Sequence, residues 1–89
     1  MELAIQNFAE TMQHKLDINK DKECDKMNPD GAGRKWDKCD LYWLLMRLRE
    51  ETLELEKALY ETDREGVIEE AADVGNFAMM IHDNVQRSK

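Results

Sequence analysis

Two pairs of carboxylate side chains share one short spacing and could bind a metal ion together. Glu51 and Glu54 are three residues apart, and Glu70 and Asp73 have the same spacing. Residues three apart are neighbours on one face of an α-helix, so each pair would present its oxygens on a single turn. Four carboxylates without histidine or cysteine suit Mg²⁺ or Mn²⁺ rather than zinc. The spacing therefore predicts a divalent-cation site where the two pairs meet.

Glu70 is the carboxylate that packing alone explains least well. On a helical wheel it projects into an apolar arc, and Asp73 lies at the edge of that arc; the arc contains Val67, Val74, Phe77, Ala78, Ile81 and Val85. An ionised carboxylate in such a place costs several kcal/mol unless it is paired or binds a metal. A salt bridge to Arg47, Arg49 or Lys15 is the alternative to a metal.

Three helices are expected to position these side chains. The first spans roughly residues 2–18, with a stripe at helical spacing formed by Ile5, Phe8, Met12 and Leu16. The second begins after Asp37 or Asp40, either of which offers an N-cap oxygen, and extends to about Tyr60. The third spans about residues 64–85. The predicted fold class is all-α, a small antiparallel helical bundle.

Two breaks separate these helices. Residues 19–37 lose the periodicity and contain the turn sequence Asn-Pro-Asp-Gly at 28–31, so we expect a flexible loop there. The second break is short, at residues 61–63, with Thr62 or Asp63 as the next N-cap. Helices joined by so short a break are antiparallel neighbours, which would bring the two carboxylate pairs face to face.

The second helix is apolar on two sides. Its core stripe comprises Leu41, Leu44, Leu45, Leu48, Leu55 and Leu59. A second strip on another side, called the α2 strip below, comprises Tyr42, Met46, Leu53 and Tyr60. A helix with two apolar sides is buried from two directions. We expect the α2 strip to be buried by another subunit, or by the loop at residues 19–37 if it folds back over the helix.

Composition and charge exclude several classes of protein. The 89 residues are the length of one domain, 1–89, and their net charge of −7 is the wrong sign for binding a nucleic-acid backbone. Residues 50–73 hold ten acids and two bases, so a cationic partner is expected there. Long apolar runs and an export signal are both missing, which predicts a cytoplasmic protein without membrane contact.

The cysteines and histidines of the chain do not suggest a second metal site. Cys24 and Cys39, with His14 and His82, lack the close spacing of zinc ligands. In a chain without an export signal, two ordinary thiols are the expected state of the two cysteines.

The two acidic motifs, taken in order, resemble those of a known family. The sequence EExxE at residues 50–54 and ExxD at residues 70–73 is similar to the metal motif of the MazG-like nucleoside triphosphate pyrophosphohydrolases. That family belongs to the all-α NTP pyrophosphatases, alongside the dimeric dUTPases. LxxExxELxxAL at residues 48–59 and EEAADVxNFAMMI at residues 69–81 extend the resemblance, which covers about residues 35–83.

The resemblance implies an activity and roles for the carboxylates. It implies Mg²⁺-dependent cleavage, with Mn²⁺ as a substitute, of an NTP or dNTP to the monophosphate and pyrophosphate, in a homodimer or a dimer of dimers. The implied metal ligands are Glu51, Glu54, Glu70 and Asp73. Glu50 and Glu51 are the implied catalytic carboxylates, with Glu50 either supporting a ligand or orienting water. The wheel, however, points Glu50 away from Glu51.

Four further residues are candidates for binding the substrate. Asn76 follows Asp73 by one helical turn and would hydrogen-bond sugar or base, or else form a polar contact between helices. Trp36 would stack on a base, with Arg34 and Lys35 reaching the phosphates, or else Trp36 is a hydrophobic plug.

The resemblance leaves the source of the phosphate-binding cations open. Many relatives use Lys and Arg of a further helix, whereas only Arg87 and Lys89 follow the last motif here. Two other functional classes therefore remain possible for this protein. One is a metal-binding interaction module with little turnover, and the other is a purely structural helical oligomer in which Glu70 is a buried ion-pair partner.

Overall fold

The computed structural model describes residues 1–19 and 36–88 of the chain. These residues form three α-helices, α1 (Leu3–Ile18), α2 (Leu41–Tyr60) and α3 (Arg64–Arg87), and a short 3₁₀ helix, η1 (Trp36–Lys38). The described part contains no strand, so the all-α fold class is confirmed for it. The helix ends lie close to those that the apolar periodicity predicts.

Aspartate side chains begin the two longer helices. The Asp40 carboxylate accepts a hydrogen bond from the Trp43 amide at 3.2 Å, and the Asp63 carboxylate accepts one from the Gly66 amide at 3.0 Å. Each bond satisfies an amide that has no partner inside its helix. Asp40 and Asp63, of the predicted alternatives, are therefore the N-caps. Thr62 instead has a φ of 53° in the turn between the helices.

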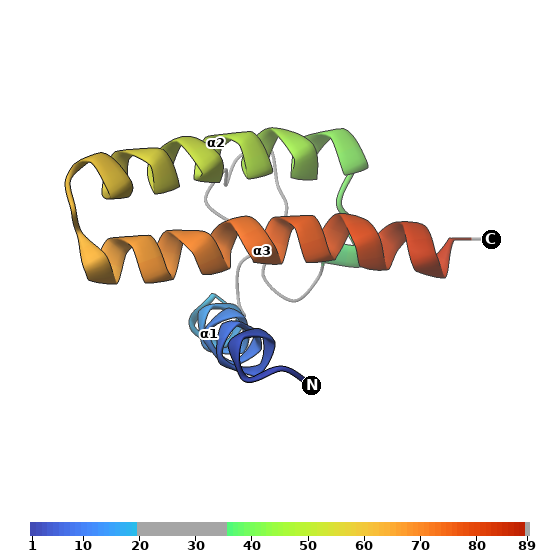
Figure 1. The fold of residues 1–89 in the computed structure, drawn as a ribbon. Helices are drawn as coiled ribbons and strands as arrows, with labels where there is room; N and C mark the ends of the chain where they lie inside the picture. Colours follow the sequence, from blue (N-terminus) through green and yellow to red (C-terminus); the bar gives the residue numbers. More distant parts are fainter. Residues whose placement is uncertain (20–35, 89) are drawn as a thin grey trace.

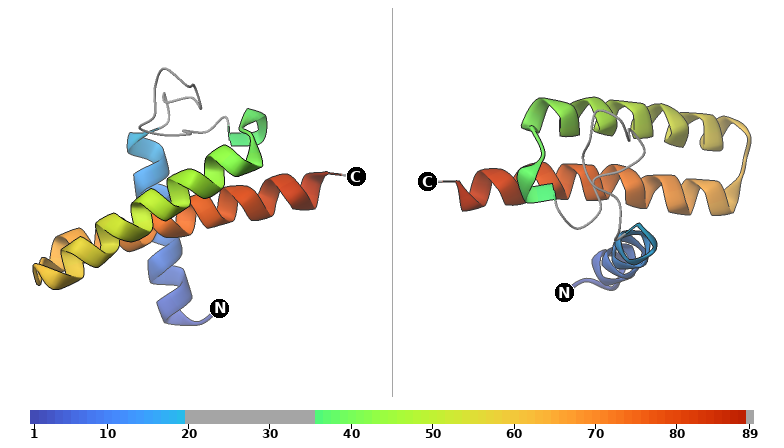
Figure 2. Two further views of the ribbon diagram at one scale, coloured as in Figure 1. Left: turned by 90° about the horizontal axis from the view of Figure 1, so that it is seen from above. Right: turned by 180° about the vertical axis from the view of Figure 1, so that it is seen from behind.

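The helices α2 and α3 lie side by side and antiparallel, while α1 crosses them. Figure 1 shows α1 almost end-on when the other two helices lie in the plane, and Figure 2 shows it running across α3. The predicted antiparallel arrangement is thus present for α2 and α3, but α1 does not run along them. Because crossing helices touch over a limited length, only part of the α1 stripe is covered; Ile5 remains 55% exposed.

The core lies between α2 and α3. Leu44 is completely buried and packs with Phe77, Met80 and Cys39. Several positions predicted as core are exposed instead: Leu41, Leu59, Ala78 and Val85. Three of these lie at or near helix ends, where the partner helix covers less of the stripe. Cys39 is disulfide-bonded, which corrects the expectation of ordinary thiols; Cys24 lies outside the described residues.

The α2 strip is exposed in the single chain. Tyr42 and Tyr60 are each about four-fifths exposed, at 79% and 81%, and Met46 and Leu53 are at least half exposed. The alternative cover for this strip, the loop at 19–37, falls mostly outside the described residues. None of the described helices is both long and apolar enough to cross a membrane.

Gly75 is the point at which α1 and α3 approach each other. A Cβ atom at this position would lie 2.6 Å from Cζ of Phe8 and 3.3 Å from Sδ of Met12. The first distance is far inside van der Waals contact, so a side chain here would push α1 away from α3. The absence of a side chain at Gly75 is therefore what allows this crossing.

We predict that Gly75→Ala lowers the free energy of unfolding. Overpacking costs about 1–3 kcal/mol, whereas the gain in helix propensity is roughly 1 kcal/mol. Urea denaturation measures the difference. In a Phe8→Ala background the obstructing ring is gone, so the same substitution should be neutral or stabilising. A stabilising effect of Gly75→Ala in the unmodified chain would contradict the proposed contact.

Candidate metal-binding site

The antiparallel pairing of α2 and α3 brings three of the four predicted ligands together. Glu51 comes from the middle of α2, and Glu70 and Asp73 come from one turn of α3. One carboxylate oxygen from each of the three lies within 4.8 Å of the others. All three side chains are partly buried. Glu54, the fourth predicted ligand, is exposed and lies outside this three-residue cluster.

A pocket of about 540 Å³ opens over the cluster. Its lining residues are Arg47, Glu50, Glu51, Leu53, Glu54, Glu70 and Asp73. Glu54 therefore faces the same space as the cluster, from its rim. Glu50 also lines the pocket, although the helical wheel directs it away from Glu51. The pocket is large enough for a solvated ion together with a group of several atoms.

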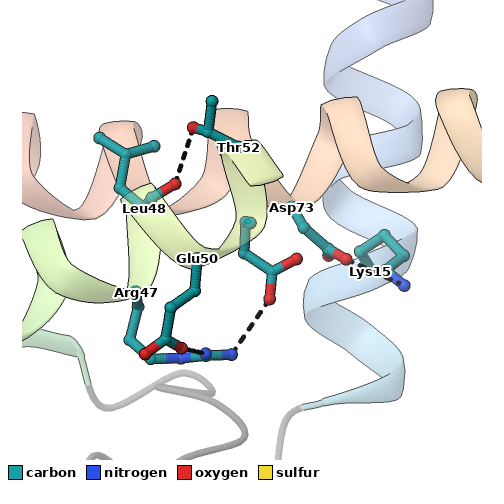
Figure 3. Close-up of polar contacts among 7 residues, drawn as sticks. Lys15, Arg47, Leu48, Glu50, Thr52 and Asp73 are labelled. Carbon is teal, nitrogen blue, oxygen red and sulfur yellow. Dashed lines mark hydrogen bonds and ion pairs between the residues drawn. The ribbon is translucent and has the colours of Figure 1, made fainter. Parts of the chain in front are cut away.

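Two basic side chains hold the outer carboxylates of the cluster. Nη2 of Arg47 donates to Oε1 of Glu51 at 3.1 Å, and Nη1 of the same arginine pairs with Glu50. Nζ of Lys15, from α1, lies 3.4 Å from Oδ2 of Asp73. Figure 3 shows the two cations approaching the carboxylates from opposite sides. Each cation offsets part of the repulsion between the acids.

Glu70 is the third member of the cluster, and neither Arg47 nor Lys15 pairs with it. Its Oε2 is buried and has no hydrogen-bond partner. Burial, a hydrogen bond with Glu51 and the negative charges of Glu51, Asp73 and Glu54 raise the pKa of Glu70 to about 7. Burial also raises the pKa of Asp73, although Lys15 opposes that shift. Within residues 1–19 and 36–88 no salt bridge to Glu70 is formed: of the three alternative partners, Lys15 and Arg47 pair with other acids and Arg49 is exposed.

This arrangement fits a hard divalent cation. The donors are carboxylate oxygens, which Mg²⁺ and Mn²⁺ prefer. A buried oxygen without a partner carries a desolvation cost that a bound cation would remove. The fit thus rests on the unpartnered Oε2 of Glu70 as well as on the proximity of the three acids.

Asn76 is engaged in packing. It is buried, and its Nδ2 donates to the Met12 carbonyl on α1 at 3.1 Å. Its Oδ1 is buried without a partner. Asn76 does not line the pocket described above. Of the two predicted roles, the structure therefore shows the contact between helices.

Trp36 is held at the carboxyl-terminal half of α3. Its Nε1 donates to Oδ2 of Asp83 at 2.8 Å, and its carbonyl oxygen accepts a bond from Nδ2 of Asn84 at 2.9 Å. The indole also packs against the core. These contacts match the hydrophobic-plug interpretation of Trp36. Arg34 and Lys35, the other predicted substrate contacts, lie outside the described residues.

The sequence suggests Arg47 and Lys15 only as alternative partners of Glu70, and not as partners of Glu51 and Asp73. Arg47 precedes Glu50 and Glu51 by three and four positions, so its contacts with them follow from helical spacing. That signal was available in the sequence. Lys15 reaches Asp73 only because α1 crosses α3 at Gly75, and no local pattern predicts that crossing.

Comparison with known proteins identifies no relative of this chain: no protein family, no curated protein and no solved structure matches it. The interpretation of the site therefore receives no support from similarity to an identified protein. Its interpretation rests on the geometry and on the sequence motifs.

We predict that the metal-free protein loses stability as the pH rises from about 4.5 to about 7. The pKa of Glu70 is about 7 in the folded chain, above its ordinary value of 4.5. The folded state therefore binds the proton more tightly, and this advantage is lost as the pH rises through the folded pKa. Thermal unfolding in the presence of a chelator, between pH 4 and pH 8, measures the effect.

Glu70→Gln should remove this part of the pH dependence and make the chelated protein more stable at pH 8. Glu69→Gln is the matched control, because Glu69 is the exposed neighbour of Glu70 and carries the same charge. The comparison of variants also cancels the titration of the two histidines. Parallel pH profiles of stability for the wild type and both variants would show that the pKa of Glu70 is not raised in the folded chain.

Proposed function

We propose that this protein is a Mg²⁺-dependent nucleoside triphosphate pyrophosphohydrolase. The observation that carries the proposal is the meeting of Glu51, Glu70 and Asp73, with the buried Oε2 of Glu70 left without a partner. The resemblance of the EExxE and ExxD motifs to the MazG-like family supplies the reaction, cleavage of an NTP or dNTP to monophosphate and pyrophosphate. The proposed reaction would take place in the cytoplasm and would serve nucleotide-pool housekeeping.

The carboxylates have separate tasks in this proposal. Glu51, Glu70 and Asp73 would hold the cation, and Glu54 would add an oxygen from the rim. Mg²⁺, or Mn²⁺ in its place, would neutralise phosphate charge and make bound water more acidic. Glu50 faces the pocket and lies outside the three-residue cluster, which suits a group that orients the attacking water.

We further propose that a second copy of the chain covers the α2 strip. The strip presents four large apolar side chains to solvent, two of them tyrosines about four-fifths exposed. A small helical domain gains stability by burying such a face. A twofold axis would place the strip of one copy against the same strip of the other. The resulting homodimer is the unit from which a dimer of dimers would be built.

The metal is tested first, by thermal unfolding. A cation that binds only the folded chain stabilises it by about 2.7 kcal/mol at one hundred times its dissociation constant. Mg²⁺ or Mn²⁺ should therefore raise the melting temperature, and Glu70→Gln should abolish most of that rise. Glu56→Gln, an exposed position of α2 outside the pocket, should keep it. Equal melting curves with and without excess cation would exclude the metal site.

The reaction is tested next, with a panel of nucleoside triphosphates and Mg²⁺. At least one nucleotide should give equal amounts of monophosphate and pyrophosphate. Glu51→Gln or Asp73→Asn removes a charged ligand, so turnover should fall on the order of a hundredfold, while Glu56→Gln stays active. Cation-dependent stability without pyrophosphate release would instead support the metal-binding interaction module.

The dimer is tested by sedimentation. The wild-type protein should have twice the 10.5 kDa mass of one chain. Met46→Glu places a charge in the middle of the α2 strip, so it should shift the protein towards the monomer. Val85→Glu, at an exposed apolar position of α3 outside the strip, should not. A wild-type protein that stays a 10.5 kDa monomer at high concentration would refute the dimer.

A further inference from the structure

Arg47 is the one basic side chain among the described residues that line the acidic pocket. The other charged lining residues are Glu50, Glu51, Glu54, Glu70 and Asp73. When all of them are ionised, the lining has five negative charges against one positive charge. An anionic ligand that enters with divalent cations would therefore meet a single positive side chain on this wall.

The guanidinium of Arg47 is held in place from several directions. Its side chain is only 11% exposed, and its two terminal nitrogens pair with Glu50 and Glu51. Its Cζ lies 5.3 Å from the centre of the Phe77 ring, a distance at which a cation is attracted by the ring face. Its rotamer is thus already fixed, so little side-chain entropy remains to be lost when a ligand binds.

The hydrogen bonds of Arg47 are incompletely satisfied within the described part of the chain. Each terminal nitrogen has two N–H groups, and each donates to one glutamate. Its Nε is buried and has no hydrogen-bond partner. Any cation bound between Glu51 and Glu70 would also compete with Arg47 for the Glu51 carboxylate. The guanidinium therefore has donors to offer once the cluster is loaded.

We propose that Arg47 is the phosphate-binding cation of this pocket, and this inference rests on the proposed function. With divalent cations on Glu51, Glu70 and Asp73, the guanidinium donates to oxygens of the polyphosphate chain. A guanidinium fork matches two phosphate oxygens at once, which an ammonium group does not. Arg47 would thereby supply a phosphate contact from the lining of the pocket itself.

Lys15 does not have the same position. It pairs with Asp73 at 3.4 Å from the side of α1, but it is not part of the pocket lining. Its charge therefore holds a metal-binding carboxylate in place rather than facing the ligand. Arg49, two residues after Arg47, is exposed and also lies outside the lining. It carries the same charge on the same helix and is the matched control.

The test uses inorganic triphosphate, which contains the phosphates without base or sugar. Calorimetric titration with Mg²⁺ present should show Arg47→Gln binding it about tenfold or more weakly than the wild type, because a charge-assisted contact is lost. Arg47→Lys keeps the charge but loses the fork, so its affinity should lie between the two. Arg49→Gln should bind as the wild type does, and all four proteins should still bind Mn²⁺.

The outcomes separate this inference from the proposed function. Equal affinity of Arg47→Gln and Arg49→Gln, or no binding of triphosphate by the wild type, would overturn the role of Arg47. If Arg47→Gln fails to fold, Arg47→Lys decides, and wild-type affinity in that variant overturns the role. Pyrophosphate release with an unchanged KM in Arg47→Gln would refute the role and leave the enzyme. Arg47-dependent triphosphate binding without nucleotide turnover would refute the enzyme and leave the role.

Discussion

Three carboxylates approach one another closely at the interface of α2 and α3, and their charge determines which other contacts the site needs. Like charges within 4.8 Å and partly removed from water repel one another. Burial, together with the hydrogen bond to Glu51 and the nearby negative charges, raises the pKa of Glu70 to about 7. The antiparallel helices cannot relieve it by moving apart, because Leu44 and Phe77 are buried in the same interface. The chain therefore has to compensate the charge locally.

The compensation comes from two elements and is incomplete. Arg47 acts within α2, and Lys15 is brought by α1, whose crossing depends on the missing side chain at Gly75. Asn76, one residue further on, fixes the same crossing through its bond to the Met12 carbonyl. Packing of α1 and the electrostatics of the site are thus coupled. Among the described residues, Glu70 is the member of the cluster with which no basic side chain pairs.

Local features of this fold could be predicted from the sequence, whereas its long-range contacts could not. Apolar periodicity and capping residues place the helices, because both are properties of neighbouring residues. The i,i+3 spacing of acids predicts which side chains share a turn, and the short break at 61–63 predicts that α2 and α3 are antiparallel. The angle of α1 depends on contacts between residues far apart in the sequence, such as the close approach of Phe8 to Gly75 and the bond from Asn76 to the Met12 carbonyl.

The incomplete compensation is also what makes the site suited to a ligand. If Arg47 and Lys15 neutralised every acid, a divalent cation would have to displace both before binding. If neither were present, mutual repulsion would oppose the antiparallel packing itself. The observed arrangement lies between these limits: Arg47 and Lys15 pair with Glu51 and Asp73, while Oε2 of Glu70 is buried and has no hydrogen-bond partner in the described part of the chain. Binding at that oxygen would recover a desolvation cost already present in the folded chain.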